Sequence, residues 1–487
     1  MATQHPDNAR APYWERDGDG FVSSHEETEE CVEAFQGLGV EEFMWDWEGK
    51  FTDEAVVDRL FHHYLSYFKK NPLGLKKRLT FRIPNIWEEK GYSLIRSLMV
   101  ILTSEDFARD LNFPIPLFEV ILPMTENAKQ LIFIQKSFRE LAQLKSKMFS
   151  KFRKNTEYIN IIPLFEGVDT QINAKKILKE YIGLHKKSFG RNPSYLRVFI
   201  ARSDPAMVSG LVGTVLANKI ILSDLRELEE ETKIPFYPIL GAGSLPFRGG
   251  LNPLAIKDFD REYPGLSTIT IQSAFRYDYP LPRVREAVKF YNTKSPKYSE
   301  RISKNERRKL IKLIYLFEQK YRKSLDKITP KLKVVFASFP KRRERHLHIG
   351  LLSYGRKINK TILPRAITFT GSLYSVGIPP EFLDIEGLAT LKSNDLMLLN
   401  KYYKNYTNHL NQAGKFLNFE NLRKLSGAAI EKFIKKGANI LQIKWGAKNK
   451  DEIRYKKLTT KVLGSQGNTK KIKSLIIQTG IIRKSLG

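Results

Sequence analysis

Two carboxylates each follow an apolar run, and their positions are those of a divalent-metal site. Glu166 ends the segment Ile161-Ile-Pro-Leu-Phe-Glu166, and Asp204 follows the run Val198-Phe-Ile-Ala201. If these runs are parallel strands of one sheet, both carboxylates lie at the same edge and can point at one hard cation, such as Mg²⁺ or Mn²⁺. Structural alternatives remain open. Glu166 is also suited to pair with an arginine, and Asp204 to cap a helix that begins near Pro205.

Several arginines stand where a bound anion is expected. Arg248 lies in Pro246-Phe-Arg-Gly-Gly250, in which Gly249 and Gly250 let the backbone approach an anion closely. A tight turn with an exposed arginine explains the same motif. Three further arginines interrupt stretches of apolar or small residues, namely Arg202, Arg276 and Arg365. A buried arginine needs an anionic partner, so one carboxylate explains any single case, whereas a converging set favours a small polyanion.

The histidines give a weaker signal. His5 lies beside Pro6 in the opening segment, for which a frayed terminus is the default expectation. His346 and His348 alternate after a basic run, so they share a face if that run is extended. A basic surface loop is the plainer interpretation of the second pair.

Other classes of chemistry are disfavoured. No nucleotide-binding P-loop, dinucleotide-binding glycine fingerprint or serine-hydrolase elbow occurs in the sequence. Cys31 is the only cysteine, which excludes an internal disulfide and a cysteine metal cage and fits a reducing cytoplasm. No uninterrupted run of about 18 apolar residues occurs, so we expect a cytoplasmic protein without a membrane partner.

The charge keeps a second function open. The chain carries 82 Lys and Arg against 52 Asp and Glu, a formal net charge of +30. The excess is densest from Arg301 to Arg345 and returns from Lys456 to Lys484. Such a balance raises the alternative of a basic nucleic-acid-binding protein. Basic runs on helices are more often solvated faces, so we expect no specific nucleic-acid partner.

The element pattern predicts an α/β fold, a (β/α)8 TIM-type barrel with additional C-terminal helices. Helix-period segments separate most of the candidate strands, and a doubly wound open sheet is the alternative. We expect one catalytic unit over 1–487, with the barrel at about 40–380 and helical additions at about 381–487. The candidate strands are Glu42–Trp47, Leu79–Ile83, Pro116–Pro123, Tyr158–Phe165, Tyr195–Ala201, Phe236–Gly241, Ser267–Gln272 and Lys333–Ser338.

Taken together, the motifs resemble the archaeal-type phosphoenolpyruvate carboxylases, the short branch of that enzyme family. The resemblance covers most of the chain. It runs through Met1–Ala9, Trp45–Lys50, Phe118–Met124, Pro163–Glu166, Phe247–Pro253, Gln272–Asp278, Lys341–Arg345, Pro364–Thr370 and Gly377–Phe382. It implies an irreversible, metal-dependent carboxylation of phosphoenolpyruvate by bicarbonate, through carboxyphosphate and enolpyruvate, which gives oxaloacetate and phosphate. It also implies a homotetramer that supplies the citric acid cycle.

The resemblance assigns roles to the candidate residues. Glu166 and Asp204 would bind the metal, and Arg248, with Gly249 and Gly250, would hold the transferring phosphoryl group. His5 would assist the breakdown of carboxyphosphate. The remaining anion contacts would come from Arg276 and Arg365.

Two departures limit this transfer. Met207 stands where the longer plant and bacterial enzymes have a lysine, and Leu240-Gly-Ala242 replaces their His-Gly-Arg. The missing anion contacts must therefore come from other basic residues. An enolase-like or pyruvate-kinase-like barrel acting on the same substrate is a further alternative.

Overall fold

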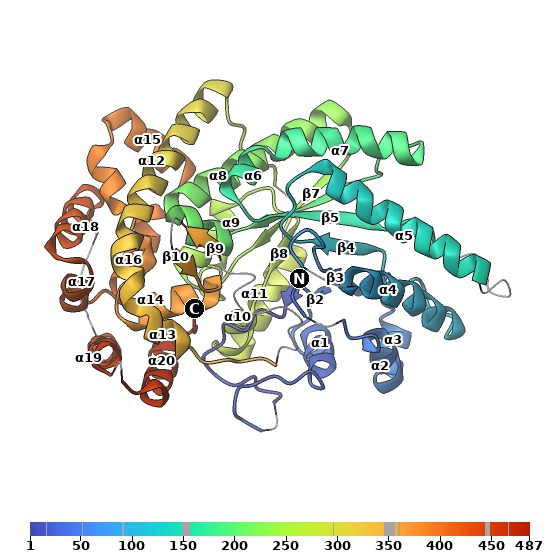
Figure 1. Cartoon of the computed structure of the whole chain (residues 1–487), viewed down its shortest axis with the longest axis horizontal. Helices are drawn as coiled ribbons and strands as arrows, with labels where there is room; N and C mark the ends of the chain where they lie inside the picture. The colour runs from blue at the N-terminus through green and yellow to red at the C-terminus, as the bar shows by residue number, and fades with distance from the viewer. Residues whose placement is uncertain are drawn as a thin grey trace.

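The barrel is built from parallel strands joined in sequence order. The computed structural model describes residues 1–487 apart from 16, 51, 90–91, 149–155, 296, 345–355, 359–360, 444–448 and 466. Eight parallel strands form one sheet in the order β1 to β8 (Figure 1). They are β1 (Ala2–Thr3), β2 (Glu42–Asp46), β3 (Arg78–Arg82), β4 (Glu119–Leu122), β5 (Asn160–Phe165), β6 (Leu196–Ala201), β7 (Phe236–Gly241) and β8 (Thr268–Thr270). The predicted barrel class is confirmed.

The shortest strand closes the barrel. Ala2 pairs with Phe43 of β2 on one side and forms a bridge with Ile271, just beyond β8, on the other. The Thr3 amide donates to the Ile271 carbonyl oxygen at 3.1 Å. Because both edges of β1 are paired, β2 and β8 are joined through it and no strand edge is left open there.

One of the predicted strands is wrong. The segment Lys333–Ser338 forms the helix α13 (Lys333–Ala337) instead of a strand, and β1 supplies the remaining strand of the barrel. A short apolar run does not distinguish a buried strand from a buried helical turn. Val335 packs with α14 (Ala366–Ser375) and α20 (Thr469–Arg483) in the helical core, far along the chain from the strands.

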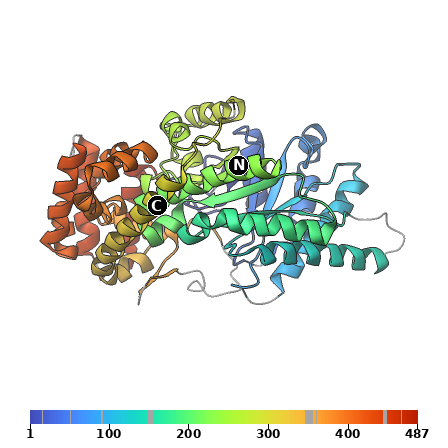
Figure 2. The same ribbon diagram turned by 90° about the horizontal axis from the view of Figure 1, so that it is seen from above.

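Helices cover the barrel and extend it to one side. Those of the barrel half are α1 (Glu27–Gln36), α2 (Val56–His63), α3 (Leu65–Lys70), α4 (Ser93–Asp110), α5 (Ala128–Met148), α6 (Val168–Ile172), α7 (Ala174–Phe189), α8 (Ser203–Thr232), η1 (Pro246–Arg248), α9 (Ile256–Glu262), α10 (Ser273–Tyr277) and α11 (Leu281–Thr293). The C-terminal helices then lie together on one side of the barrel (Figures 1 and 2). The predicted C-terminal helical additions are therefore confirmed.

The elements after α11 are mostly helical. Besides α13, α14 and α20, they are α12 (Lys304–Ile328), η2 (Thr329–Leu332), η4 (Pro380–Phe382), η5 (Ile385–Thr390), α15 (Ser393–Tyr402), α16 (Tyr406–Gly414), α17 (Phe419–Ser426), α18 (Ala428–Leu441) and α19 (Lys450–Gly464). The short strands β9 (Arg356–Ile358) and β10 (Thr361–Leu363) form an antiparallel pair outside the barrel. Polar side chains fix several helix starts, as when Ser303 and Glu306 form a capping box at α12.

Helix α8 joins the barrel to the helical side. It starts directly after β6, packs along α12 and kinks at Gly210, whose φ is 83°. The Asp384 carboxylate accepts from the Val212 amide at 3.0 Å, so it satisfies a backbone donor that the kink exposes. In the described part of the chain α8 is the one helix long and apolar enough to cross a membrane, and 94% of its apolar window is buried inside the protein, as in a core helix.

The amino ends of the strands are held by a buried ion network. Arg197 of β6 contacts Glu42 of β2 and Glu119 of β4, with N···O distances of 2.7 Å to each carboxylate. Thr80 and Tyr195 donate to the same carboxylates at 2.6 Å. Burial raises the pKa of Glu42, but the charge and hydrogen bonds of Arg197 outweigh it, so the pKa lies below its ordinary value. A cavity of about 790 Å³ opens beside this network.

Removing the central cation of this network will destabilise the barrel. We expect Arg197→Met to lower the free energy of unfolding by about 3–5 kcal/mol, because it leaves Glu42 buried without its counter-charge and Glu119 with only the half-exposed Arg78, 3.7 Å away. Urea titration at neutral pH measures the change. The control is Arg283→Met, which breaks the exposed pair with Glu286 and should change stability by about 0.5 kcal/mol or less. Equal effects of both substitutions would contradict the interpretation.

Candidate active site

A cavity of about 100 Å³ lies at the carboxyl ends of the strands. Side chains that follow β1, β2, β3, β5, β6 and β8 line it, as expected for the active side of a parallel barrel. The structure brings five of the predicted site residues together there: His5, Glu166, Asp204, Arg248 and Arg365. Further polar residues complete the lining: Glu48, Arg82, Arg202, Ser203 and Gln272.

The two carboxylates come from neighbouring strands. Glu166 directly follows β5, and Asp204 lies in the first turn of α8, just after β6. β5 and β6 are hydrogen-bonded, with Phe165 opposite Ile200. Within the described residues Asp204 makes no hydrogen bond or ion pair, and it does not cap α8, whose N-cap position is Arg202. Its carboxylate is therefore left to a ligand in the cavity.

A buried cation stands beside Glu166. Arg82, at the end of β3, contacts both oxygens of Asp46 and one oxygen of Glu48, each at 2.8 Å. Burial lowers the pKa of Arg82, but the charges of Asp46, Glu48 and Glu166 raise it well above its ordinary value. The guanidinium thus stays positive at the cavity wall, where the charge of Glu166 acts on it.

Arg248 is held by residues from distant parts of the chain. It is 1% exposed, which rules out the exposed turn considered from the sequence. Its Nη1 contacts Asp7 Oδ2 at 3.0 Å, and its Nε donates to Ser203 Oγ at 3.1 Å. The guanidinium also donates to the side chain of Gln272 and to the backbone carbonyl of Gly487. These contacts fix the guanidinium plane at the edge of the cavity.

The segment that carries His5 is ordered, so the expectation of a frayed terminus is wrong. Strand pairing holds Ala2 and Thr3, and Asp7 accepts from the Ala274 amide at 2.7 Å. The His5 carbonyl accepts from the Ser273 amide, and its Nδ1 lies 2.8 Å from Thr3 Oγ1. The imidazole is therefore oriented by its own strand at the cavity.

The comparison with known proteins decides the class of this site. A family model described as phosphoenolpyruvate carboxylase matches residues 1–487. The chain belongs to the phosphoenolpyruvate carboxylase family.

Named relatives agree over nearly the full length. A phosphoenolpyruvate carboxylase of Leuconostoc mesenteroides is 42% identical over 100% of this chain and 98% of its own length. Those of Pyrococcus horikoshii and Metallosphaera sedula are 39% and 36% identical, over 86% and 100% of this chain and 88% and 99% of theirs. The resemblance to archaeal-type phosphoenolpyruvate carboxylases and the predicted enzyme class are confirmed.

Not every predicted residue of this carboxylase lines the cavity. Arg276 lies outside the lining, where it pairs with Glu30 at 3.0 Å and donates to the Thr3 carbonyl at 2.8 Å. It is 0% exposed, so it has the structural pairing that the sequence left open, with Glu30 as its partner. Gly249 and Gly250 are also not part of the lining, but their positive φ angles of 127° and 74° shape the loop behind Arg248.

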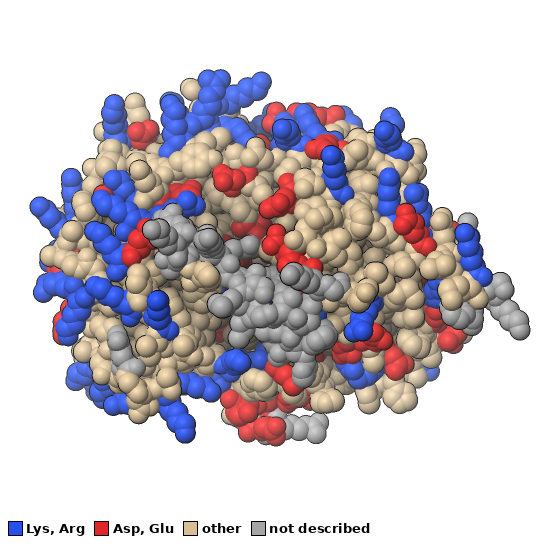
Figure 3. All heavy atoms as spheres, in the orientation of Figure 1, with Lys and Arg blue, Asp and Glu red and all other residues tan. Residues whose placement is uncertain are grey.

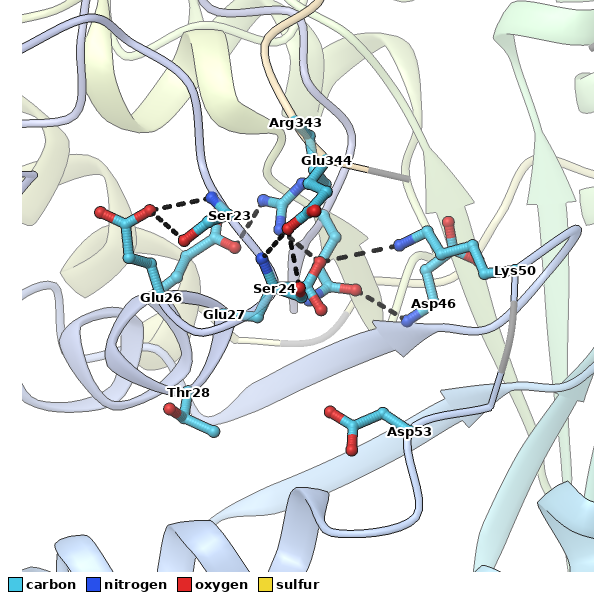
Figure 4. A network of polar contacts seen from close by, with 12 residues as sticks. Ser23, Ser24, Glu26, Glu27, Thr28, Asp46, Lys50, Asp53, Arg343 and Glu344 are labelled. Carbon is cyan, nitrogen blue, oxygen red and sulfur yellow. Dashed lines mark hydrogen bonds and ion pairs between the residues drawn. The ribbon is translucent and has the colours of Figure 1, made fainter. Parts of the chain in front are cut away.

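The basic run before residue 345 serves the structure as far as it is described. Arg343 contacts Glu27 at 2.9 Å and also Glu30, while Arg342 donates to backbone carbonyls. Glu344 accepts from the amide and hydroxyl of Ser24, as Figure 4 shows. These contacts tie the run to the segment around α1. His346 and His348, as well as Arg345, lie outside the described residues.

Three residues that hold Arg248 were not predicted from the sequence to do so: Asp7, Ser203 and Gln272. All contact Arg248. Gln272 ends a predicted strand and Ser203 lies beside the predicted metal ligand Asp204, so strand-end position was the available signal for both. No such signal pointed to Asp7, because no strand is recognisable in the sequence of its segment.

The loop behind Arg248 has no room for a side chain at Gly249. A Cβ there would lie 2.6 Å from Ala242 Cβ and 3.3 Å from Arg202 Cγ. We expect Gly249→Ala to displace Arg248 and lower kcat/KM for phosphoenolpyruvate by about tenfold or more. Gly190→Ala is the matched control, because Gly190 also has positive φ, at 73°, but nothing lies within 4 Å of its Cβ position. Unchanged kinetics for both variants would contradict the steric argument.

Proposed function

We propose that this chain carboxylates phosphoenolpyruvate with bicarbonate, irreversibly, to give oxaloacetate and phosphate. The observation that carries the proposal is the meeting of Glu166, Asp204 and Arg248 in one cavity at the carboxyl ends of the barrel strands. Family membership supports the same reaction. The proposal includes a cytoplasmic homotetramer that replenishes the citric acid cycle.

The donor set fits Mg²⁺ or Mn²⁺. The described residues contain no cluster of three or more His, Cys, Asp or Glu that would enclose a metal. Two carboxylates fit a hard cation that keeps water and substrate oxygens as its other ligands, whereas a structural zinc site would need four protein ligands. When bound between Glu166 and Asp204, the ion would act as a Lewis acid on substrate oxygens.

The cationic side chains account for the handling of the phosphoryl group. Arg248, fixed by Asp7 and Ser203, neutralises charge on the group as it passes from the enol oxygen to bicarbonate. Transfer forms a bond from the bicarbonate oxygen to phosphorus and breaks the bond to the enol oxygen. This leaves carboxyphosphate and the enolate of pyruvate. Arg82 and Arg365 supply positive charge from other parts of the wall.

The second half of the reaction needs carbon dioxide to stay in the cavity. Carboxyphosphate breaks into phosphate and carbon dioxide, and the enolate carbon then bonds to carbon dioxide to give oxaloacetate. His5 is placed at the wall to assist this breakdown, with Thr3 fixing its ring. A small cavity among buried side chains favours capture over escape.

The nucleic-acid alternative receives no support from this site. Lys and Arg side chains gather over the C-terminal helices, as Figure 3 shows, whereas the cavity lies at the strand ends of the barrel. Many of those cations are solvated helix residues, such as Lys432, Lys457 and Lys473, all exposed. Such a face explains the net charge without a specific partner.

The reaction is tested by its substrates. We expect oxaloacetate, followed through malate dehydrogenase, to form only when phosphoenolpyruvate, bicarbonate and Mg²⁺ or Mn²⁺ are all present, and EDTA to abolish it. Consumption of phosphoenolpyruvate that is independent of bicarbonate and gives no oxaloacetate would favour an enolase-like or pyruvate-kinase-like barrel enzyme. A folded preparation without turnover in either metal would refute the proposal.

The metal role is tested at Asp204. We expect Asp204→Asn to lower kcat by about 100-fold or more, because the amide is a much weaker ligand for a hard cation. The melting temperature of the metal-free protein should change little, since Asp204 makes no hydrogen bond or ion pair among the described residues and interacts with Arg248 only through its charge. The control is Asp169→Asn, which alters a carboxylate on α6 that accepts from Tyr315 outside the cavity. Its kinetics should match the unmodified enzyme.

A further inference from the structure

Both backbone groups of Phe247, the residue before Arg248, are held by buried side chains. The Phe247 amide donates to Glu381 Oε1 at 2.8 Å, and its carbonyl accepts from Arg202 Nη1 at 3.0 Å. Glu381 lies 134 residues further along the chain, in η4. Two charged groups from different elements therefore hold the short helical turn η1, which ends at Arg248.

Glu381 is fully buried at this contact. It is 0% exposed, and the Tyr374 hydroxyl of α14 donates to the same oxygen, Oε1, at 2.6 Å. Oε2 is buried and has no hydrogen-bond partner in the described part of the chain. Burying a carboxylate is costly, and a fold without a need for this acceptor would place an apolar residue here.

Arg202 holds Phe247 at its carbonyl, as Glu381 holds it at its amide. It is 0% exposed, its Nε donates to the Tyr263 hydroxyl at 3.2 Å, and its Nη2 has no partner among the described residues. Its aliphatic part also fills the space beside Gly249, where a Cβ would approach Arg202 Cγ at 3.3 Å. Arg202 thus contacts the residues on both sides of Arg248.

We propose that Glu381 is a positioning residue which, together with Arg202, fixes the Phe247 peptide groups and thereby orients Arg248 toward the phosphoryl group of the substrate. The inference rests on the proposed function, because it assigns a role in handling that group. Glu381 is not among the residues that line the cavity. Its effect is transmitted through one backbone hydrogen bond to a side chain that does line it.

Several titratable and charged groups face Glu381. They are Tyr374 of α14, Arg202 before α8, Tyr321 of α12, Tyr455 of α19 and Asp384 of the same segment. Burial raises the pKa of Glu381 to about 7, and hydrogen bonds from Tyr374 and the Phe247 amide oppose it. Burial likewise raises the pKa of Asp384 to about 7. The two carboxyls have similar burial but different backbone partners.

This difference supplies a matched control. Asp384 accepts from the Val212 amide at the kink of α8, whereas Glu381 accepts from the loop that carries Arg248. We expect Glu381→Leu, which removes the acceptor, to lower kcat/KM for phosphoenolpyruvate by about tenfold or more. Asp384→Asn should leave kcat/KM within about twofold. Glu381→Gln keeps an acceptor oxygen and should retain most activity at neutral pH.

The pH dependence separates positioning from mere packing. Ionised Glu381 accepts more strongly than its protonated form, so kcat/KM of the unmodified enzyme should rise as pH passes through about 7. We expect Glu381→Gln to lose that part of the rise, since its amide does not titrate. Asp384→Asn should retain the rise, moved at most to lower pH, because Asp384 accepts from the Val212 amide and acts on Glu381 only through its charge.

Stability provides a readout that does not depend on turnover. A carboxyl whose pKa is raised on folding keeps its proton in the native state where the unfolded chain has lost it. Its stability contribution therefore falls as pH rises from about 4.5 for Glu381, or about 3.8 for Asp384, to about 7. The melting temperatures of Glu381→Gln and Asp384→Asn, relative to the unmodified protein, should therefore both increase between pH 5 and pH 8. This result confirms that both variants fold and that both carboxyls are buried.

The outcomes distinguish the two proposals. An unmodified enzyme that makes no oxaloacetate overturns the proposed function. An active enzyme whose Glu381→Leu variant keeps kcat/KM, or whose Glu381→Gln and Asp384→Asn variants change the pH profile equally, overturns the positioning role. A lower kcat/KM in Glu381→Leu and a lost pH-dependent rise in Glu381→Gln, with neither change in Asp384→Asn, support it.

Discussion

The buried pair between Arg248 and Asp7 is the constraint on which the site depends. Neither side chain is more than 1% exposed, and such a pair is tolerable only when its geometry is good and further hydrogen bonds satisfy both groups. The satisfying groups come from the barrel closure, from the starts of α8 and α10 and from the end of the chain. Placing one guanidinium therefore requires most of the tertiary structure to be correct, which explains why the short strand β1 matters beyond its size.

The charged side chains at the two ends of the barrel differ in whether they are paired. At the amino ends, Arg197 and the carboxylates of Glu42 and Glu119 satisfy one another, so that charge serves stability. At the carboxyl ends, Asp204 makes no hydrogen bond or ion pair in the described part of the chain, although its charge acts on Arg248. The amino-end cavity is the larger, but the buried charges in its lining, Glu42 and Arg197, are already paired with each other. An unpaired carboxylate among fixed cations is the arrangement that calls for a metal and an anionic substrate.

The fold could be predicted where buried strands appear in the sequence as long apolar runs. Strands such as β5 and β6 are apolar runs, interrupted only by Asn160 and Arg197, and were found, because both faces of a barrel strand are buried. The run at Val334 to Phe336 has the same composition but forms α13, since helical neighbours can bury it equally well. Ala2 and Thr3 are too few to show any period. Their strand is defined by the edges of β2 and β8, which exist only once the barrel has nearly closed.

The site residues likewise fall into those that could be predicted from the sequence and those that could not. Glu166 and Asp204 were predictable because they stand at the ends of long strands, and strand ends meet at one edge of a parallel barrel. Asp7 and Glu381 were not, because each acts through a contact with a residue more than 100 positions away. The residues proposed to bind the metal thus lie at the ends of regular strands, whereas the residues that hold Arg248 come from distant parts of the chain. The position of an arginine at the cavity therefore depends on the buried carboxylates that contact it or its loop.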